Sequence, residues 1–481
     1  MKHLRHGMNL NLIALFVVLC TGVVGCEYAE HNVRDDNVLN VDKGKWEKGL
    51  KMYSTGAFEG YTLFSPMKSN TTYLIDMFGR VVHTWESNFK PGLSVYLCEN
   101  GNLLRTARVS NQRFGGTGGA GGRVQKFTWD GELVWDYGLD SDRYFQHHDI
   151  EQLLNGNVLM IAWEYKTYKE AVAAGRKPGL LGGGGLWPDV IIEVKPVGKT
   201  GGEIIWEWHM WDHVVQDNDP AKANYGVVKD HPELLDINYA SSRGPGRRGG
   251  DWNHVNSVDY NEKLDQIVIS LHNMSEIYII DHSISIQEAA GHTGGRSGKG
   301  GDILYRWGNP QVYRAGGPAD QKLFAQHDAM WVEEGCPGEG NITIFNNGQG
   351  RRDGAYSSID EITPPVDGKG NYSLTQGSAY APAECTWIYT AERKTAFYAD
   401  HISGASRLPN GNTIICSGTN GTLFEVIPEG KTVWKYVNPF KGSVFQAQKG
   451  RGSENANSVF KVYRYASDYA GLAGRDLTRK K

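Results

Sequence analysis

The sequence has no excess of basic residues, no Cys-x-x-Cys pair and, beyond its N-terminus, no long apolar run. Its 50 Lys and Arg against 54 Asp and Glu leave a formal net charge of -4. That balance argues against nucleic-acid binding, because this function usually shows a basic footprint. The cysteine spacing offers no zinc motif. No later stretch approaches the ~18 consecutive apolar residues of a membrane span, so we expect no membrane crossing after the N-terminus.

Proline is scarce at 17 residues, whereas glycine reaches 61 and hydrophobic residues make up 40% of the 481. These proportions exclude a disordered or collagen-like polymer and indicate a turn-rich protein with a large core. The length allows several ordinary domains or one large all-β domain. Cysteine spacing assigns no disulfide, although a bond between Cys336 and Cys385 is possible in an oxidising compartment.

The N-terminus carries a secretion signal. A positively charged start precedes an apolar stretch over 12–19 that is too short to span a bilayer comfortably. The VVGC sequence at 23–26 resembles a bacterial lipobox, in which Cys26 is lipidated; an ordinary signal peptide cut nearby is the alternative. We therefore expect a signal peptide over 1–25, a lipidated cysteine and tether over 26–57, and a periplasmic lipoprotein anchored to the membrane through Cys26.

Two kinds of hairpin alternate along the chain. The first joins a hydrophobic strand through a Gly turn to a strand ending in Trp, and its copies are at 72–85, 124–135, 190–208, 276–307 and 423–436, with a weaker one from 357 to 365. The second has an Asn-Gly type turn before an apolar strand, and its copies are at 98–107, 153–162, 262–270, 338–347 and 408–417.

Alternation of these hairpins builds four-stranded sheets, and five or six such sheets arranged radially form a β-propeller. We predict an all-β, six-bladed β-propeller over residues 58–440, followed by a C-terminal extension over 441–481. Long insertions rich in Gly, Arg and Lys should form loops on the rim, and they lie at 164–190, 209–250 and 282–302. The stretch HTGGRSGKGGD at 292–302 is not a Walker motif, because Thr293 replaces the first Gly and Gly300 follows Lys299.

Histidines recur at the same point of successive repeats. His148, His254, His327 and His401 each precede a strand of the second kind, and the first two lie seven residues before the turn Asn. Equivalent residues of successive blades point at the same part of the central axis, so this spacing predicts three or four imidazoles at the mouth of one funnel. A single His more often caps a turn or packs beside Trp, but a set in phase favours a site.

A cluster of imidazoles can hold a metal, bind an anion, or act in nucleophilic and acid–base catalysis. Packed together, the rings lower one another's pKa, which keeps at least one of them neutral and nucleophilic. The nearby anion donors are Asn256, His272, Asn346, Asn347, Arg351 and Arg352. The nearby carboxylates are limited to Asp149, Asp251, Asp328 and Asp400. Such donors suit a transferring anionic group better than a bare cation, so we expect neither a metal nor another cofactor.

The motifs QHHDIEQLLNGN, NHVNSV, DQIVISLHNMSEIYIID, QHDAMW and RLPNGNTII resemble, as an ordered set, the bacterial arylsulfate sulfotransferases, which are exported six-bladed propellers. The resemblance covers roughly residues 58–440. It implies nucleotide-independent transfer of a sulfuryl group from an aryl sulfate ester to a phenol, by a ping-pong mechanism through a sulfated histidine.

By motif, the resemblance makes His327 the nucleophile, with His254, Asn256 and His148 supporting the transferring group. The best-known members have an Arg in the strand after His-x-Asn, where this sequence has His272. That departure leaves the substrate class and the pH optimum open. The substrate-binding residues that we expect are Asn256, His272, Asn347, Arg351 and His401.

Two other classes of function remain open. The first is a metal-dependent hydrolase or lyase, whose metal ligands would be His148, His254, His327 and His401. A noncatalytic lipoprotein propeller, such as a scaffold or a quinone-cofactor relative, would tolerate any change at His327, but it leaves the in-phase histidines unexplained. The natural donor and acceptor and the oligomeric state also stay open.

Overall fold

The computed structural model of the protein describes residues 48–114, 118–182, 185–240, 250–440 and 457–480. The expected signal peptide over 1–25 and Cys26 lie outside these residues. No helix in the described part is long and apolar enough to cross a membrane. All the strands belong to one compact unit, Val38–Lys481. Its cysteines Cys98, Cys336, Cys385 and Cys416 are free, so the Cys336–Cys385 bond is not formed.

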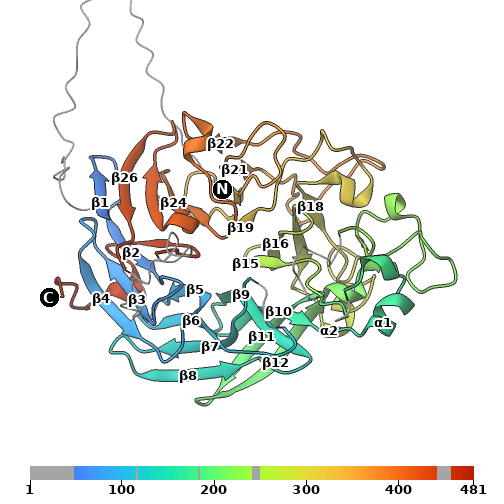
Figure 1. Ribbon diagram of the computed structural model, residues 1–481, viewed down its shortest axis with the longest axis horizontal. Coiled ribbons are helices and arrows are strands. Elements are labelled where there is room, and N and C mark those ends of the chain that lie inside the picture. The colour runs from blue at the N-terminus through green and yellow to red at the C-terminus, as the bar shows by residue number, and fades with distance from the viewer. Residues whose placement is uncertain (1–47, 115–117, 183–184, 241–249, 441–456, 481) are drawn as a thin grey trace, which may run out of the picture. The chain divides into compact units, whose positions relative to one another are not determined.

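Six antiparallel sheets follow one another around an axis and form a six-bladed β-propeller (Figure 1). Four blades consist of consecutive strands, which follow one another from the inside of the blade outward. They are β5 (Pro91–Leu97), β6 (Leu103–Arg108), β7 (Gly122–Phe127) and β8 (Leu133–Gly138); β9 (Tyr144–Gln152), β10 (Val158–Glu164), β11 (Asp189–Val197) and β12 (Gly201–His209); β15 (Val255–Asn261), β16 (Gln266–Leu271), β17 (Glu276–Asp281) and β18 (Tyr305–Trp307); and β19 (His327–Trp331), β20 (Ile342–Asn346), β21 (Ser358–Ile362) and β22 (Trp387–Tyr389).

The other two blades close the ring with strands from both chain ends. Their strands are, in one, β27 (Tyr463–Ala466), β2 (Gly60–Phe64), β3 (Thr71–Ile75) and β4 (Val81–Glu86), and in the other β23 (Gly404–Arg407), β24 (Thr413–Ser417), β25 (Thr422–Val426), β26 (Thr432–Val437) and β1 (Gly49–Tyr53). β1 and β27 lie outside the predicted range 58–440, in the expected tether and C-terminal extension. The propeller therefore extends beyond the predicted range at both ends. Closure pairs Gly60 with Ala466, a contact that local periodicity does not reveal.

Helical and minor elements lie in the connections. Within the described residues there are two short α-helices, α1 (Tyr168–Ala173) and α2 (Ile286–Ala289). Each begins with a capping box, Thr167 with Glu170 and Ser285 with Glu288. A two-stranded parallel ribbon joins β13 (Val214–Val215) and β14 (Leu235–Asp236). The 3-10 turns are Pro178–Leu180, Met210–Asp212, Val228–Asp230, Pro310–Tyr313, Lys394–Ala396, Gly418–Asn420 and Ala470–Leu472.

The recurrent Trp of the first hairpin type locks each blade to the next. Its indole N–H donates to a backbone carbonyl in the outer hairpin of the following blade, at 2.8 to 3.0 Å. The six pairs are Trp85 with Thr128, Trp135 with Gly201, Trp206 with Ile284, Trp307 with Pro382, Trp387 with Pro428 and Trp434 with Met77. Five of the six rings are buried, and a large apolar ring with one donor suits an apolar interface that offers one carbonyl, which explains why the repeat contains this residue.

Candidate active site

The innermost strands β5, β9, β15 and β19 are all irregular near the start of the strand. Each pairs with its neighbour through a register shift. At these points the backbone enters the left-handed region, with φ of 134° at Leu93, 49° at His148, 57° at His254 and 54° at Asp328. Such angles are uncommon for non-glycine residues and cluster at functional sites. A bulge of this kind changes the direction of the side chains next to it. Here the bulges occur at equivalent positions of the innermost strands of successive blades.

Four histidine rings form a chain, which we call the histidine arc. Ring centroids are 4.6 Å apart for His148 and His254, 5.1 Å for His254 and His272, and 5.4 Å for His272 and His327. His148, His254 and His327 are buried, and His272 is partly exposed. The structure therefore brings together three of the four in-phase histidines, as the spacing predicted, and adds His272 between two of them.

His327 is held in one tautomer. Its Nδ1 lies 2.8 Å from Oδ1 of Asn347, whose Nδ2 donates to the carbonyls of Ala399 and Ile402 at 2.7 and 2.9 Å. Because both amide hydrogens are used in this way, the oxygen of Asn347 must face the ring and accept the proton of Nδ1. Burial, with His272 adding a smaller effect, holds the pKa of His327 well below its usual value. The ring is therefore neutral, with its lone pair on Nε2.

The other buried histidines have partners of their own. Nδ1 of His254 donates to Oδ2 of Asp251 at 2.6 Å, which places its proton on that nitrogen. Nδ1 of His148 lies 2.8 Å from Nδ1 of His147, whose Nε2 is 2.8 Å from Oδ1 of Asp189, without hydrogen-bond alignment. Burial and then His254 lower the pKa of His148 well below its usual value. The sequence analysis missed His147 and Asp189; the doubled His of QHHD was the available signal.

Two residues that the sequence analysis did not single out line the arc. The ring of Phe460 is 6.1 Å from that of His148 and 6.5 Å from that of His327. Gly119 lies against His148 so closely that a Cβ there would be 1.9 Å from Cε1 of the ring. Its φ of 87° also favours glycine. The glycine-rich run around Gly119 was the signal in the sequence; nothing local pointed to Phe460.

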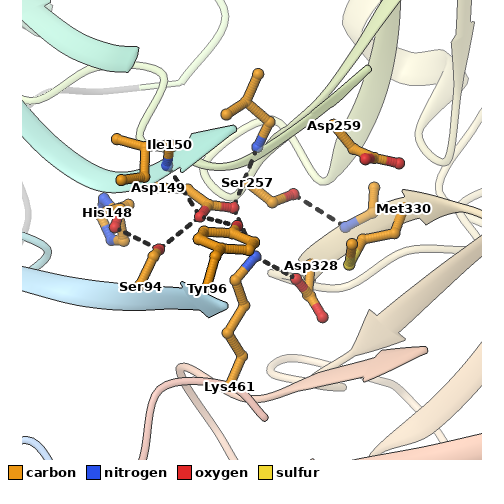
Figure 2. A network of polar contacts seen from close by, with 12 residues as sticks. Ser94, Tyr96, His148, Asp149, Ile150, Ser257, Asp259, Asp328, Met330 and Lys461 are labelled. Carbon is orange, nitrogen blue, oxygen red and sulfur yellow. Dashed lines mark hydrogen bonds and ion pairs between the residues drawn. The ribbon is translucent and has the colours of Figure 1, made fainter. Parts of the chain in front are cut away.

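Next to the arc lies a charged network, whose two aspartates directly follow His148 on β9 and His327 on β19 (Figure 2). Nζ of Lys461 is 2.7 Å from Oδ2 of Asp149 and 3.1 Å from Oδ1 of Asp328. The hydroxyls of Tyr96 and Ser94 donate to Oδ1 of Asp149. We call these five residues the axial network. Burial works against the charge of Lys461, but Asp149 and Asp328 outweigh it and raise the pKa of the lysine well above its usual value.

Two expected substrate ligands are engaged with the protein itself. Nδ2 of Asn256 donates to the carbonyl of Gln326 at 2.8 Å, so this residue ties β15 to the residue before His327. The guanidinium of Arg351 lies 4.6 Å from the ring centroid of Tyr356 and donates to the hydroxyl of Ser358 at 2.6 Å. Both side chains thus have structural contacts that the sequence did not reveal.

The remaining expected ligands lie nearer the solvent. His401 is 54% exposed, and its Nδ1 is 2.6 Å from Oδ1 of Asp400. Asn347 holds the loop that contains His401, because its amide donates to the carbonyls of Ala399 and Ile402. Nδ1 of His272 donates to Oδ1 of Asn273 at 2.9 Å, because the amide nitrogen of Asn273 is bound to the carbonyl of Trp252.

The arc can be compared with the other groups of potential metal ligands in the chain. In the described part of the chain, three potential ligand atoms come within 4.8 Å of one another only at His213, His292 and Asp302, which do not belong to the arc. Fold and site define a propeller whose axis carries a row of imidazoles backed by amide and carboxylate groups, in which burial keeps His148 and His327 neutral. That arrangement serves nucleophilic and acid–base chemistry on an anion.

The sequence matches the Arylsulfotransferase (ASST) family over residues 37–459, so the chain belongs to that family. Its activity is therefore arylsulfate sulfotransfer in general, and aryl sulfates and phenols are the substrates that the family implies. No curated protein shows significant similarity to the chain.

Several solved structures are similar at low identity. A protein of unknown function from Bacteroides caccae is 11% identical with a TM-score of 0.43, over 84% of this chain and 98% of that one. Virginiamycin B lyase from Staphylococcus aureus is 10% identical with a TM-score of 0.37, over 85% and 87%. The β-propeller domain of Swd1 from Myceliophteria thermophila is 9% identical with a TM-score of 0.38, over 82% and 90%. These similarities concern the fold alone.

Proposed function

We propose that the protein transfers a sulfuryl group from an aryl sulfate ester to a phenol in two steps, through a sulfated His327 and without a nucleotide. The observation that supports this most is the contact of His327 with Asn347, whose oxygen accepts the proton of Nδ1 at 2.8 Å. The nucleophile is then Nε2 of a ring that burial keeps neutral.

In the first step, Nε2 of His327 attacks the sulfur, an N–S bond forms, and the bond from sulfur to the aryl oxygen breaks. The leaving phenolate, whose conjugate acid has a pKa of ~10 like that of Tyr, takes a proton from the imidazolium form of His254. Asp251 stabilises that imidazolium from Nδ1, at 2.6 Å. In the second step, the acceptor phenol returns a proton to His254 while its oxygen attacks the sulfur and the N–S bond breaks.

The sulfuryl group in flight carries negative charge on its three equatorial oxygens, as a phosphoryl group does, so catalysis depends on alignment and on fixed donors. His272 lies between the rings of the reacting pair, His254 and His327, and His148 lies next to His254 on its other side. His272 uses Nδ1 toward Asn273, so it donates from Nε2 only when protonated. An Arg would donate at every working pH, and the His272→Arg variant should keep its activity to higher pH than the wild type. Asn256 aligns the strand of His327, and His401 would contact the outer part of the substrate.

The test uses purified protein, treated with a chelator, and a chromogenic aryl sulfate with and without excess phenol. Release of the chromogenic phenol is followed together with intact mass. Wild type should show release that depends on the acceptor and a mass gain of one sulfuryl group that maps to His327. His327→Ala should lose both, whereas His231→Ala, a change at an exposed histidine, should lose neither.

Release without any adduct would exclude the covalent route. Activity that disappears with chelator and returns with metal would favour the metal-dependent hydrolase. An unchanged His327→Ala variant would favour a noncatalytic propeller.

We also propose that the protein is exported and anchored through a lipidated Cys26. This proposal rests on the lipobox-like sequence at 23–26. The wild-type protein should partition with membranes and carry a lipid-sized mass on its N-terminal residue. Cys26→Ala should abolish both, and a soluble wild type without that added mass would contradict the proposal.

A further inference from the structure

A second histidine cluster lies at the outer edge of two neighbouring blades. His213 follows β12 and the 3-10 turn Met210–Asp212, whereas His292 and Asp302 come from the insertion between β17 and β18. Nδ1 of His213 and Nδ1 of His292 lie 2.8 and 2.7 Å from the same oxygen, Oδ1 of Asp302. Three potential ligand atoms thus converge on one point.

The inner histidine is held in a fixed orientation. His213 is 1% exposed, its ring stacks on Trp208 at 5.4 Å and 5°, and its Nε2 lies 2.8 Å from the carbonyl of Ala289. A carbonyl only accepts, so Nε2 donates to it, and Nδ1 is the nitrogen that faces the carboxylate of Asp302. A backbone carbonyl on the far nitrogen is also the usual support of a metal-bound histidine.

The outer ligand has room to adjust. The side chain of His292 is 57% exposed, so its ring can move without disturbing a core. Tetrahedral zinc bonds of about 2.0–2.1 Å place ligand atoms about 3.4 Å apart, which requires the three groups to separate by about half an ångström. Two histidines, one carboxylate and water at the fourth position form a known type of zinc coordination.

We propose that His213, His292 and Asp302 bind a divalent transition-metal ion of the zinc class. The ion would fasten the insertion between β17 and β18 to the adjacent blade. That insertion already meets β12, because α2 packs against β12 (Figure 1) and the indoles of Trp206 and Trp208 donate to the carbonyls of Ile284 and Gly301. The site is separate from the histidine arc, so it does not depend on the proposed chemistry of His327.

The test is a titration of the whole mature protein with zinc alone, after a chelator has been removed by dialysis. Calorimetry should give one equivalent bound per chain, and the melting temperature should rise by several degrees. Cobalt should give the visible absorption of a tetrahedral site. His292→Ala, at the exposed ligand, should lose all three effects without a risk to folding, and Asp302→Asn should weaken them.

Two controls make the result decisive. His231→Ala removes an exposed histidine whose Nδ1 meets only the carboxylate of Glu233, at 2.9 Å, and it should bind zinc as the wild type does. His327→Ala, in the histidine arc, should also keep the site. The proposal is overturned if the wild type binds no zinc, if His292→Ala binds as much as the wild type, or if His327→Ala removes the binding. None of these readouts uses sulfotransfer, so failure here leaves the proposed function standing.

Discussion

His148 and Asp149 are consecutive residues of β9, as His327 and Asp328 are of β19, yet the two pairs meet opposite surroundings. The histidines face an arc of other imidazoles, and burial keeps His148 and His327 neutral. The aspartates face Lys461, which makes an ion pair with both (Figure 2). On each bulged strand, two adjacent residues therefore have different roles. The histidine is suited to catalysis, and the aspartate after it holds the blades together. The arc should govern activity, and the axial network should govern stability.

The largest effect is expected from Lys461→Met. This change leaves Asp149 and Asp328 buried beside each other without a cation, which should cost about 3–5 kcal/mol in the free energy of unfolding. Denaturant unfolding measures it. The matched control is Lys263→Met, because Lys263 also bridges two carboxylates, those of Glu334 and Glu339, but at an exposed position. If the two variants have equal unfolding midpoints, Lys461 does not stabilise the protein more than an exposed lysine does, and the axial network does not govern stability.

Asn347→Leu should act on activity instead. Loss of the acceptor frees the tautomer and orientation of His327, and misplacement of a nucleophile typically costs about 10²-fold in kcat. Steady-state kinetics with a chromogenic aryl sulfate would show the fall in kcat with a smaller change in KM. Asn347→Asp keeps an acceptor toward Nδ1 and should lose less. If both variants lose activity equally, the contact with Nδ1 is not what matters.

Gly119→Ala should disturb the arc from outside. The added methyl would meet the ring of His148, at a backbone φ of 87°. Overpacking of this kind costs about 1–3 kcal/mol, and the displaced ring should lower activity as well. Gly131→Ala is the matched control, since Gly131 has a φ of 85° and no atom within 4 Å of an added Cβ. A variant at 119 that behaves like the one at 131 would show that the contact with His148 is unimportant.

The smallest effect is a difference in pH dependence. The folded pKa values of His148 and His327 lie below about 6.5, so the unfolded chain takes up protons first and stability falls as pH drops below about 6.5. Asp259, beside the axial network, has its pKa raised by burial to about 7. There the unfolded chain loses its proton first, and stability falls as pH rises from about 4 to about 7. Each group contributes up to about 1.4 kcal/mol per pH unit.

Unfolding midpoints between about pH 4 and about pH 7 test this difference. His148→Gln should flatten the loss on the acid side, and Asp259→Asn should flatten the loss on the neutral side. If His148→Gln leaves the acid side as steep as in the wild type, burial does not keep that ring neutral.

Much of the fold could be read from the sequence because its signals are local. The alternation of apolar residues, the Asn-Gly turns and the recurrent Trp depend on neighbours within one hairpin, and the structure uses each Trp as a lock to the next blade. The meeting of His148, His254 and His327 followed from the same regularity, since equivalent points of successive blades share one axis.

Only the tertiary structure decided how the ring closes and how each site residue is used. β1 and β27 pair with strands about 400 residues away in the sequence, and Lys461 enters the axial network from that closing segment. Asn256 and Arg351 were expected as substrate ligands. In the structure they donate hydrogen bonds to the carbonyl of Gln326 and to the hydroxyl of Ser358. His213 meets Asp302 only because α2 folds back on the adjacent blade. Contacts between residues far apart in the sequence depend on how the blades are placed in three dimensions. Repeats and turns depend on residues that are adjacent in the sequence.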